Sequence, residues 1–325
     1  MDERKFPRVS RPVGVLVTGT SGFIGKQLVE HLVARNFGVR ELGRADLTTL
    51  VNDGEVLSAP FENCSAVVHL AGRAHVLDKT SQTTLATYRQ ANRDTTLALA
   101  RAAASSGVRR FVFVSSIRVN GASTQRPFTA ADPPSPEEPY ATSKHEAEQG
   151  LWKIAHETGM EIVVVRPSLV YGPEVKANFL RLLQLASSGL PLPLGSAKGV
   201  RSLISIWNFC DLLERCVDDP NAAGKTLLAA DGEDVTLPSL IKSLAVAMSR
   251  PCRLFPVPIP LLQAATMLVG KRATLDKLTA SLQVDISETR NALNWTPPVS
   301  LADGLARTAQ WYAHTQLARL RRRRK

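Results

Sequence analysis

The stretch from Val13 to Gly25, VGVLVTGTSGFIG, decides the fold of this chain. It opens with an apolar run of strand length and ends in three glycines spaced by three, Gly19, Gly22 and Gly25. Such glycines let the backbone turn sharply and approach a pyrophosphate, and the N-terminus of the next helix offers N–H donors to the same group. Because this turn separates a strand from a helix, the sequence predicts a dinucleotide-binding site here.

Outward from this turn, apolar runs of strand length alternate with helical patterns through the first half of the chain. The expected strands are 13–17, 39–42, 66–70, 111–115 and 162–165, and the expected helices are 25–35, 91–106 and 140–157. Continuous β-branched runs separated by helices indicate a parallel sheet that is covered on both faces. The predicted class is therefore α/β, with a doubly wound parallel Rossmann sheet. The region from Asp46 to Asn63 is short for a full βα unit, so the third strand is the least defined element.

The rhythm changes after Gly172, where a Gly/Pro-rich loop at 189–199 precedes segments that mix short strands with helices. We predict a smaller C-terminal part that binds the substrate. The expected division is a dinucleotide-binding domain over 12–172, completed by 200–230, a substrate-binding portion over 173–199 and 231–315, and a basic tail over 316–325.

Charge and cysteine content narrow the class of protein. The net charge is +11, and residues 319–325 hold six of the basic side chains. A solvated terminus accounts for such a run, so nucleic acid is not expected as a partner. The four cysteines include no CxxC pair, which excludes a disulfide scaffold and a zinc ribbon, and no metal is expected. The charged first twelve residues lack the apolar core of a signal peptide, which favours a cytoplasmic protein.

The most apolar later stretch is Leu254 to Gly270, LFPVPIPLLQAATMLVG. It is 17 residues long and is broken in its first half by three prolines, so no transmembrane segment is expected. We expect an extended lead and then a short helix whose apolar side packs on the body. A patch that faces a membrane or a partner is the alternative.

The end of the second strand bears on the choice of cofactor. An acidic residue just past this strand binds the adenosine ribose, whereas an arginine accepts a 2′-phosphate. Here Glu41 lies within the strand, and Gly43 and Arg44 follow it. NAD or NADP is expected, and Arg44 favours NADP.

Three side chains point to acid–base chemistry at the carboxyl edge of the sheet. Tyr140 and Lys144 are four residues apart at the start of a predicted helix, so they project from one face. A lysine ammonium close to the phenol would lower the pKa of Tyr140 and make it usable as an acid and base. Ser116 ends an upstream strand, where its hydroxyl can steady a reacting oxygen.

With these residues in view, the sequence resembles the extended short-chain dehydrogenase/reductase family, in its NAD-dependent epimerase/dehydratase group that acts on nucleotide sugars. The resemblance covers roughly residues 13–312. The matching stretches are Thr18–Gly25, His69–Gly72, Asn92, Ser116–Gly121, Tyr140–Lys144, Arg166–Pro167, Tyr171–Pro173, Arg201–Ile206 and Leu293–Pro298.

The resemblance implies an enzyme and a role for each matching residue. Tyr140 would donate and accept the proton, Lys144 would bind the nicotinamide ribose and depress the pKa of Tyr140, and Ser116 would hold the sugar oxygen. Arg201 would grip the nucleotide diphosphate, and Asn178 would contact the substrate. The implied cofactor-binding residues are Gly19, Ser21, Gly22, Phe23, Ile24, Gly25, Arg44, Leu70, Ala71, Gly72, Tyr140 and Lys144.

One departure from the family narrows the reaction. Dehydratases of the family carry Thr-Asp-Glu where this chain has Ser116-Ile117-Arg118, so the acid and base that expel water are missing. The stretch from Ser115 to Gly121 is similar to a subgroup labelled UDP-glucose 4-epimerase-like, which includes the 4-keto reductases that make UDP-N-acetylquinovosamine for surface polysaccharide. The resemblance, with Arg44, favours reduction of the C4 ketone of a UDP-4-keto-6-deoxy-N-acetylhexosamine.

Two alternatives stay open. The first is a UDP-hexose 4-epimerase with tightly bound NAD, and the second is a nucleotide-binding regulator without turnover, which the retained Tyr140 and Lys144 disfavour. The resemblance also implies a homodimer formed by two helices of each subunit, around 91–106 and 140–157. The expected small-molecule partner is a UDP-sugar.

Overall fold

A computed structural model shows how these elements are arranged, and it describes residues 14–52, 59–73, 85–268, 275–276 and 279–322. Its centre is a sheet of six parallel strands in the order β2-β1-β3-β4-β5-β9. The strands are β1 (Gly14–Thr18), β2 (Gly38–Leu42), β3 (Ala66–His69), β4 (Arg110–Val114), β5 (Glu161–Pro167) and β9 (Thr226–Ala229). Because β2 and β3 flank β1 on opposite sides, the winding reverses at β1, and the predicted doubly wound parallel sheet is confirmed.

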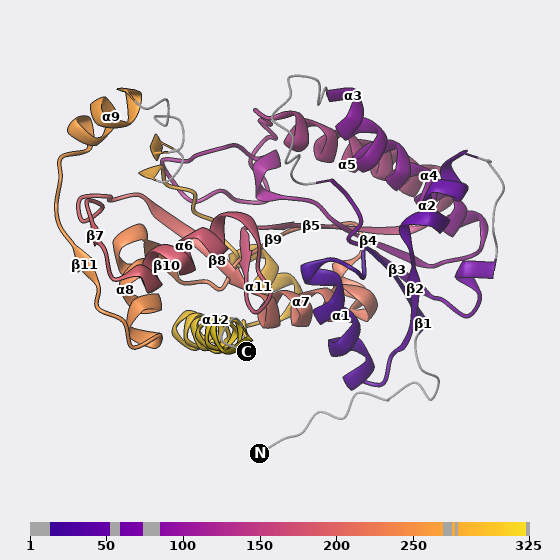
Figure 1. The fold of residues 1–325 in the computed structure, drawn as a ribbon. Coiled ribbons are helices and arrows are strands. Elements are labelled where there is room, and N and C mark those ends of the chain that lie inside the picture. The colour runs from indigo at the N-terminus through magenta and orange to yellow at the C-terminus, as the bar shows by residue number, and fades with distance from the viewer. Residues whose placement is uncertain (1–13, 53–58, 74–84, 269–274, 277–278, 323–325) are drawn as a thin grey trace, which may run out of the picture.

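Helices cover both faces of this sheet (Figure 1). On one face lie α1 (Phe23–Ala34) and α7 (Ile206–Asp218), and on the other lie α4 (Thr95–Ser105) and α5 (Pro139–Thr158). The other described helices are α2 (Arg44–Asn52), α3 (Leu85–Tyr88), α6 (Ala177–Ser188), α8 (Leu237–Ala247), α9 (Ile259–Leu268), α11 (Ser287–Leu293) and α12 (Leu301–Arg322). Four short turns of helix join them, at η1 (Ala59–Phe61), η2 (Arg89–Asp94), η3 (Ile117–Val119) and η4 (Pro220–Ala222).

Alternate residues of each strand enter two different cores. Val15 and Val17 of β1 pack with α1 and α7 on one face, whereas Leu16 packs with α4 and α5 on the other. Side chains that alternate across a strand explain why β1 is apolar at every position. Both faces of the sheet are therefore shielded from water. The carboxyl ends of its strands remain as the place where a ligand can bind.

The second half of the chain builds a smaller unit beside the sheet. Strands β10 (Asp234–Thr236), β8 (Val200–Ser205) and β6 (Leu169–Tyr171) form a three-stranded sheet, and β11 (Arg253–Leu254) pairs with β7 (Pro191–Leu192). A third apolar core gathers residues of α6, α8 and α12 against β8. The domain division made from the sequence stays a prediction, although β9 within 200–230 is a strand of the main sheet.

The basic tail over 316–325 stays a prediction, and its backbone belongs to α12 as far as Arg322. One expectation needs correction. The apolar stretch from Leu254 forms the expected helix, α9, but Leu261 and Met267 are 63% and 64% exposed. The prediction that its apolar side packs on the body is therefore wrong for these side chains. No helix in the described ranges is long and apolar enough to cross a membrane.

Candidate active site

The glycine turn lies where β1 ends and α1 begins. Gly22 N donates to Gly19 O at 3.0 Å, and Gly19 adopts φ +73°, which favours glycine. A Cβ on Gly25 would lie 2.2 Å from Gly19 O, and one on Gly19 would lie 2.8 Å from Ala71 N. The three glycines therefore bring α1, β1 and the loop after β3 closer than any side chain would allow. The result is a cradle at the point where the sheet reverses, as dinucleotide binding requires.

A buried polar chain fastens the strands beside this cradle. Thr18 Oγ1 and His69 Nδ1 lie 2.8 Å apart, and His69 Nε2 lies 3.0 Å from Thr96 Oγ1. Thr18 Oγ1 also accepts from Ala71 N at 3.2 Å. Burial, with a smaller contribution from the charge of Lys144, lowers the pKa of His69 to about 3. His69 is therefore a neutral structural link among β1, β3 and α4.

Asn92 joins the loop after β3 to α5. Its Nδ2 donates to Ser143 Oγ at 3.0 Å, and its Oδ1 accepts from Arg73 N at 2.7 Å. Asn92 lies in η2, a turn of π-helix that leads into α4. Asn92 is one of the residues that carry the family resemblance, but its role could not be predicted because its burial depends on the fold.

Ser116 and Tyr140 meet at the carboxyl edge of the sheet. Ser116 caps η3 just after β4, and its Oγ accepts from Arg118 N at 3.2 Å. The side chains of Ser116 and Tyr140 are hydrogen-bonded, which lowers the pKa of the phenol, but burial outweighs this and raises the pKa of Tyr140 to about 12. The Tyr88 ring packs edge-on against Tyr140, with centroids 6.2 Å apart. Tyr140 is thus held as a neutral acid.

Lys144 is buried below this pair, one turn along α5. Its Nζ donates to Val114 O at 2.9 Å and lies 4.5 Å from the centroid of the Phe113 ring. Burial lowers the pKa of Lys144 to about 8, against the opposing charge of Glu148. The expectation that Lys144 lowers the pKa of Tyr140 is not met here, since the groups that lower it are Ser116 and Arg118. The ammonium is committed to a backbone carbonyl instead.

Glu148, one turn after Lys144 on α5, forms a buried hydrogen-bond network that was not predicted from the sequence. Its negative charge raises the pKa of Lys144. Arg166 Nη2 and Nε donate to Glu148 Oε2 and Oε1 at 2.5 and 3.0 Å. Ser115 Oγ donates to Glu148 Oε1 at 2.5 Å, and Arg166 Nη1 donates to Asn120 Oδ1 at 3.0 Å. The spacing of Lys144 and Glu148 on α5 was the available signal, but the partner in β5 could not be assigned from it.

The predicted substrate residues lie in separate elements. Arg201 is in β8, and burial together with the charge of Arg118 lowers its pKa. Arg118 donates through Nη1 to Ala122 O at 3.2 Å, and no salt bridge to Arg118 occurs among the described residues. Asn178 is exposed at the second position of α6. The charge of Arg118, which acts on Arg201, indicates a cationic region near Ser116. No contact within the described residues joins Asn178 to this region.

Arg44 is the first residue of α2 and is exposed. Gly43 N donates to Asp46 Oδ2 at 3.1 Å, which places a carboxylate at the same turn. A 2′-phosphate bound there would meet this negative charge. The preference for NADP therefore has no support in the structure.

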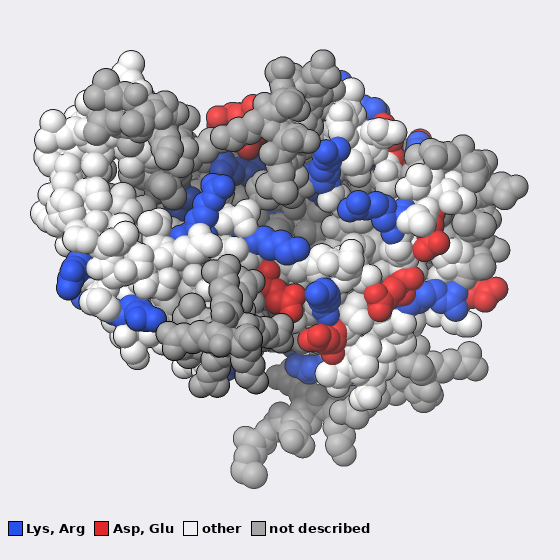
Figure 2. Space-filling model, in the orientation of Figure 1, with Lys and Arg blue, Asp and Glu red and all other residues white. Residues whose placement is uncertain are grey.

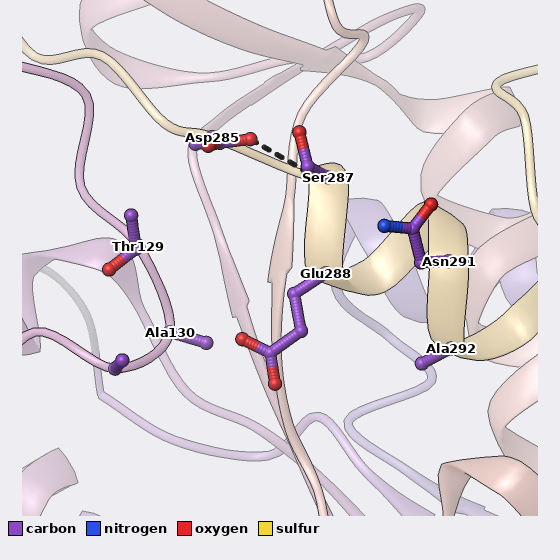
Figure 3. Close-up of a pocket in the computed structure, with 8 residues that line it drawn as sticks. Thr129, Ala130, Asp285, Ser287, Glu288, Asn291 and Ala292 are labelled. Atoms are coloured by element: carbon purple, nitrogen blue, oxygen red, sulfur yellow. Dashed lines mark hydrogen bonds between the residues drawn. The ribbon is translucent and has the colours of Figure 1, made fainter.

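A pocket of about 670 Å³ lies outside this site, between the loop at Thr129–Ala131 and α11 (Figure 3). Asp285 and Glu288 line it, and Asp285 Oδ1 accepts from Ser287 N at 2.8 Å. These hydrogen bonds lower the pKa of Asp285, so it is charged. Two carboxylates suit an anionic diphosphate poorly. The pocket holds none of the predicted site residues.

Among the described residues, His31, Asp211 and Glu214 between α1 and α7 form one cluster whose atoms lie close enough to hold a cation. His31 Nε2 and Glu214 Oε2 are 2.6 Å apart, and Trp295 Nε1 donates to Asp211 Oδ2 at 2.7 Å. Arg35 Nε lies 3.8 Å from Glu214 Oε2. These partners already satisfy both carboxylates, so we interpret the cluster as an ion-pair link between the two helices.

Comparison with known proteins gives this geometry a context. Residues 15–228 match the model of the NAD dependent epimerase/dehydratase family. The UDP-glucose 4-epimerase of Vibrio cholerae is 41% identical over 321 residues, which cover 95% of this chain and 96% of that protein.

Two solved structures share the fold. The UDP-glucose 4-epimerase of Thermotoga maritima, solved with UDP-glucose, is 21% identical with a TM-score of 0.73, over 94% of this chain and 100% of that one. MoeE5 in complex with UDP-glucose and NAD is 24% identical with a TM-score of 0.73, over 93% of this chain and 99% of that one.

Proposed function

The chain belongs to the NAD dependent epimerase/dehydratase family and is an enzyme, and within that family we propose that it interconverts the C4 epimers of a UDP-hexose. The observation that carries the proposal is the 41% identity to the UDP-glucose 4-epimerase of Vibrio cholerae along nearly the whole of both chains. The absence of the dehydratase Asp-Glu pair at Ile117-Arg118 agrees with it. The reductase activity expected from the sequence rested partly on Arg44 and NADP, and neither receives support.

NAD is the cofactor that we propose, as in the complex of MoeE5. The glycine turn fits it, because side chains at Gly19 or Gly25 would fill the cradle that the pyrophosphate needs. Gly22, Phe23 and Ile24 would present the N-terminus of α1 to the phosphates, and Ser21 is exposed at the same turn. Leu70, Ala71 and Gly72 would flank the cofactor at the end of β3. Bound NAD would take up and return the hydrogen of C4 as hydride.

Three residues of the chain would handle the proton and the sugar oxygen. Tyr140 would take the proton of the C4 hydroxyl and give it back, and Ser116 would hold that oxygen by the hydroxyl that now bonds Tyr140. Loss of a proton from a phenol of pKa about 12 is costly at neutral pH, so positive charge near it is needed. Arg118 supplies part of this charge, and Lys144 stands one helical turn away.

The nucleotide end of the substrate would bind by charge. Arg201 would grip the diphosphate with its planar guanidinium, and Arg118 would add a second cation on the same side of Ser116. Two guanidinium groups near each other repel, and an anion bound between them relieves this repulsion. A contact between Asn178 and the substrate is implied by the family resemblance alone and stays a prediction.

The test is to purify the enzyme, desalt it and identify any nicotinamide cofactor released on denaturation. We expect NAD at close to one per chain, and interconversion of UDP-glucose and UDP-galactose, or of their N-acetyl forms, without added cofactor. Protein without cofactor that oxidises NADPH only in the presence of a UDP-4-keto sugar would contradict the epimerase and restore the reductase. The homodimer and the use of the product in surface polysaccharide stay predictions.

A further inference from the structure

We propose that one edge of the smaller unit docks on the surface of an anionic lipid bilayer. This edge is formed by α9, the β7–β11 pair and the exposed face of α8, and we call it the apolar edge. Its exposed hydrophobic side chains are Leu190, Val246, Phe255, Leu261 and Met267. The inference concerns where the enzyme sits and does not depend on which sugar it epimerises.

The first observation is that exposed hydrophobic residues gather here. Large hydrophobic side chains scattered singly on a surface are normal, whereas a group of them marks a contact surface. In the described part of the chain the other exposed large hydrophobics are Val33 on α1 and Leu169 on β6, and the remaining ones all belong to the apolar edge. Leu261 and Met267 are also more exposed than Val33, which is 55% exposed.

Helix α9 carries the clearest signal. Eight of its ten residues, IPLLQAATML, are apolar and none is charged, and a helix of this composition is normally buried. Its Gln263 makes a polar contact, in which Nε2 donates to Asp276 Oδ1 at 2.9 Å. Within the described residues no member of α9 is buried or belongs to one of the three apolar cores. Figure 1 shows α9 at the tip of the smaller unit, away from the main sheet. The exposed Leu261 and Met267 are available to an apolar surface outside the chain.

Backbone pairing holds β7 and β11 together, and α9 follows β11 in the sequence. Phe255 N donates to Leu192 O at 3.1 Å, and Pro191 is the register partner of Arg253. A Cβ on Gly189 would lie 3.3 Å from Pro251, which places Leu190 beside the segment that leads to β11. The exposed Leu190 and Phe255 therefore lie on one small ribbon, and the chain passes directly from it into α9.

The second observation is the charge of this segment. Between Asp234 and Asp276 the sequence has no Asp or Glu but five basic residues, which are Lys242, Arg250, Arg253, Lys271 and Arg272. The first three are exposed, and the last two lie outside the described residues. In Figure 2 the edge that carries α8 and the β7–β11 pair shows white and blue side chains and no red. Such a surface complements the negative headgroups of an anionic membrane.

The charge of the apolar edge and the length of α9 favour a bilayer surface over a second copy of the chain or a membrane span. A second copy of the chain, docked through the same edge by a two-fold axis, would bring two basic segments together, which like charges oppose. A span of the membrane is excluded for α9, because ten residues reach only about half of the length that a bilayer requires. A short apolar helix flanked by basic residues instead lies in the interface, with its apolar side among the acyl chains.

The test is co-sedimentation of the purified full-length enzyme with vesicles of phosphatidylcholine, with and without phosphatidylglycerol. We expect binding to the anionic vesicles only, weakened by added salt. The double variant Leu261→Asp/Met267→Asp should lose binding by more than about tenfold, because it places charge in the acyl region. The variant Arg250→Gln/Arg253→Gln should lose about fivefold for each charge removed.

The matched control is Val33→Asp, which alters an exposed hydrophobic residue on α1, away from the apolar edge. It should bind vesicles as the wild type does, and all these variants should keep epimerase activity, which reports that they are folded. Equal binding by Val33→Asp and the Leu261→Asp/Met267→Asp variant, or no binding to anionic vesicles, would overturn the proposal. So would a wild-type dimer that the Leu261→Asp/Met267→Asp variant converts to a monomer in light scattering, because the edge would then belong to a second copy.

Discussion

Glu148 lies one turn beyond Lys144 on the buried side of α5, and its negative charge is what opposes the effect of burial on the lysine. The two residues are 2% and 4% exposed, so water screens their interaction little. Arg166 and Ser115 hold the Glu148 carboxylate in place. Although burial raises its pKa, hydrogen bonds with His145, Arg166 and Ser115 keep the pKa of Glu148 below the usual value. The protonation of Lys144 therefore depends on a residue that we do not expect to touch the substrate.

Glu148→Gln should move the alkaline limit of activity to lower pH. Without the carboxylate, burial and the remaining Arg166 cation lower the pKa of Lys144 further below about 8, so the ammonium is lost at a lower pH. The pH profile of kcat/KM should shift down by about one unit or more. Glu146→Gln is the matched control, because Glu146 lies on the same helix but pairs with Arg89.

Breaking the buried pair also costs stability, about 3–5 kcal/mol when one partner is removed. The double variant Glu148→Gln/Arg166→Met removes both charges, so the alkaline limit of activity can still be measured in it if the single variant unfolds. An unchanged alkaline limit in both variants would show that Glu148 does not set the protonation of Lys144.

Tyr140→Phe should lower kcat by about 10²–10⁴-fold and leave NAD bound, because it removes only the hydroxyl that carries the proton. Tyr88→Phe is its control, since the ring that packs on Tyr140 is kept. Turnover and the cofactor content of the desalted protein are measured together. Substantial activity in the Tyr140→Phe enzyme would remove Tyr140 from the chemistry.

Gly25→Ala should weaken NAD binding by about tenfold or more, since its Cβ would lie 2.2 Å from Gly19 O and force the turn apart. Gly107→Ala provides the comparison, because Gly107 has φ +78° and no atom within 4 Å of an added Cβ. That variant should lose only about 1 kcal/mol of unfolding free energy to backbone strain. Titration calorimetry on cofactor-free protein measures the NAD affinity of both variants. Equal affinities would contradict the proposal that the glycine turn binds NAD.

His69 should make the protein less stable as the pH falls below about 6.5. Its pKa is about 3 in the folded chain, so between these values the unfolded chain binds the proton more readily. This contribution is complete above pH 6.5 and declines at up to about 1.4 kcal/mol per pH unit below it. Urea unfolding of the wild type and of His69→Gln between pH 4 and pH 7, in steps of roughly half a unit, measures it. Equal slopes would show that His69 is not the group responsible.

Local patterns predicted the parts of the fold that depend on neighbours in sequence. The expected helix at 140–157 matches α5 at Pro139–Thr158, and the expected strand at 111–115 matches β4 at Arg110–Val114. The glycine turn was assigned correctly to the junction of β1 and α1. Periodicity and glycine spacing are read within one segment, so they need no knowledge of what packs against it.

The behaviour of Tyr140 and Lys144 could not be predicted in the same way. Their spacing correctly placed both on one side of α5, but the direction of the Lys144 ammonium depends on Val114 O in β4. The pKa of Tyr140 depends on burial by other elements, which no local pattern records. Spacing therefore placed the two residues on one helix and misjudged their electrostatics. Their catalytic role stays a prediction.

By itself, the sequence determined the doubly wound sheet, the glycine turn and the pair of Tyr140 and Lys144, because each is specified by residues close together in the chain. Only the tertiary structure decided that Arg166 in β5 neutralises Glu148 in α5, and that Asn92 in η2 holds Ser143. It also decided that the apolar helix α9 lies exposed. These features arise where segments far apart in sequence meet or fail to meet, and burial and charge pairing are properties of that packing.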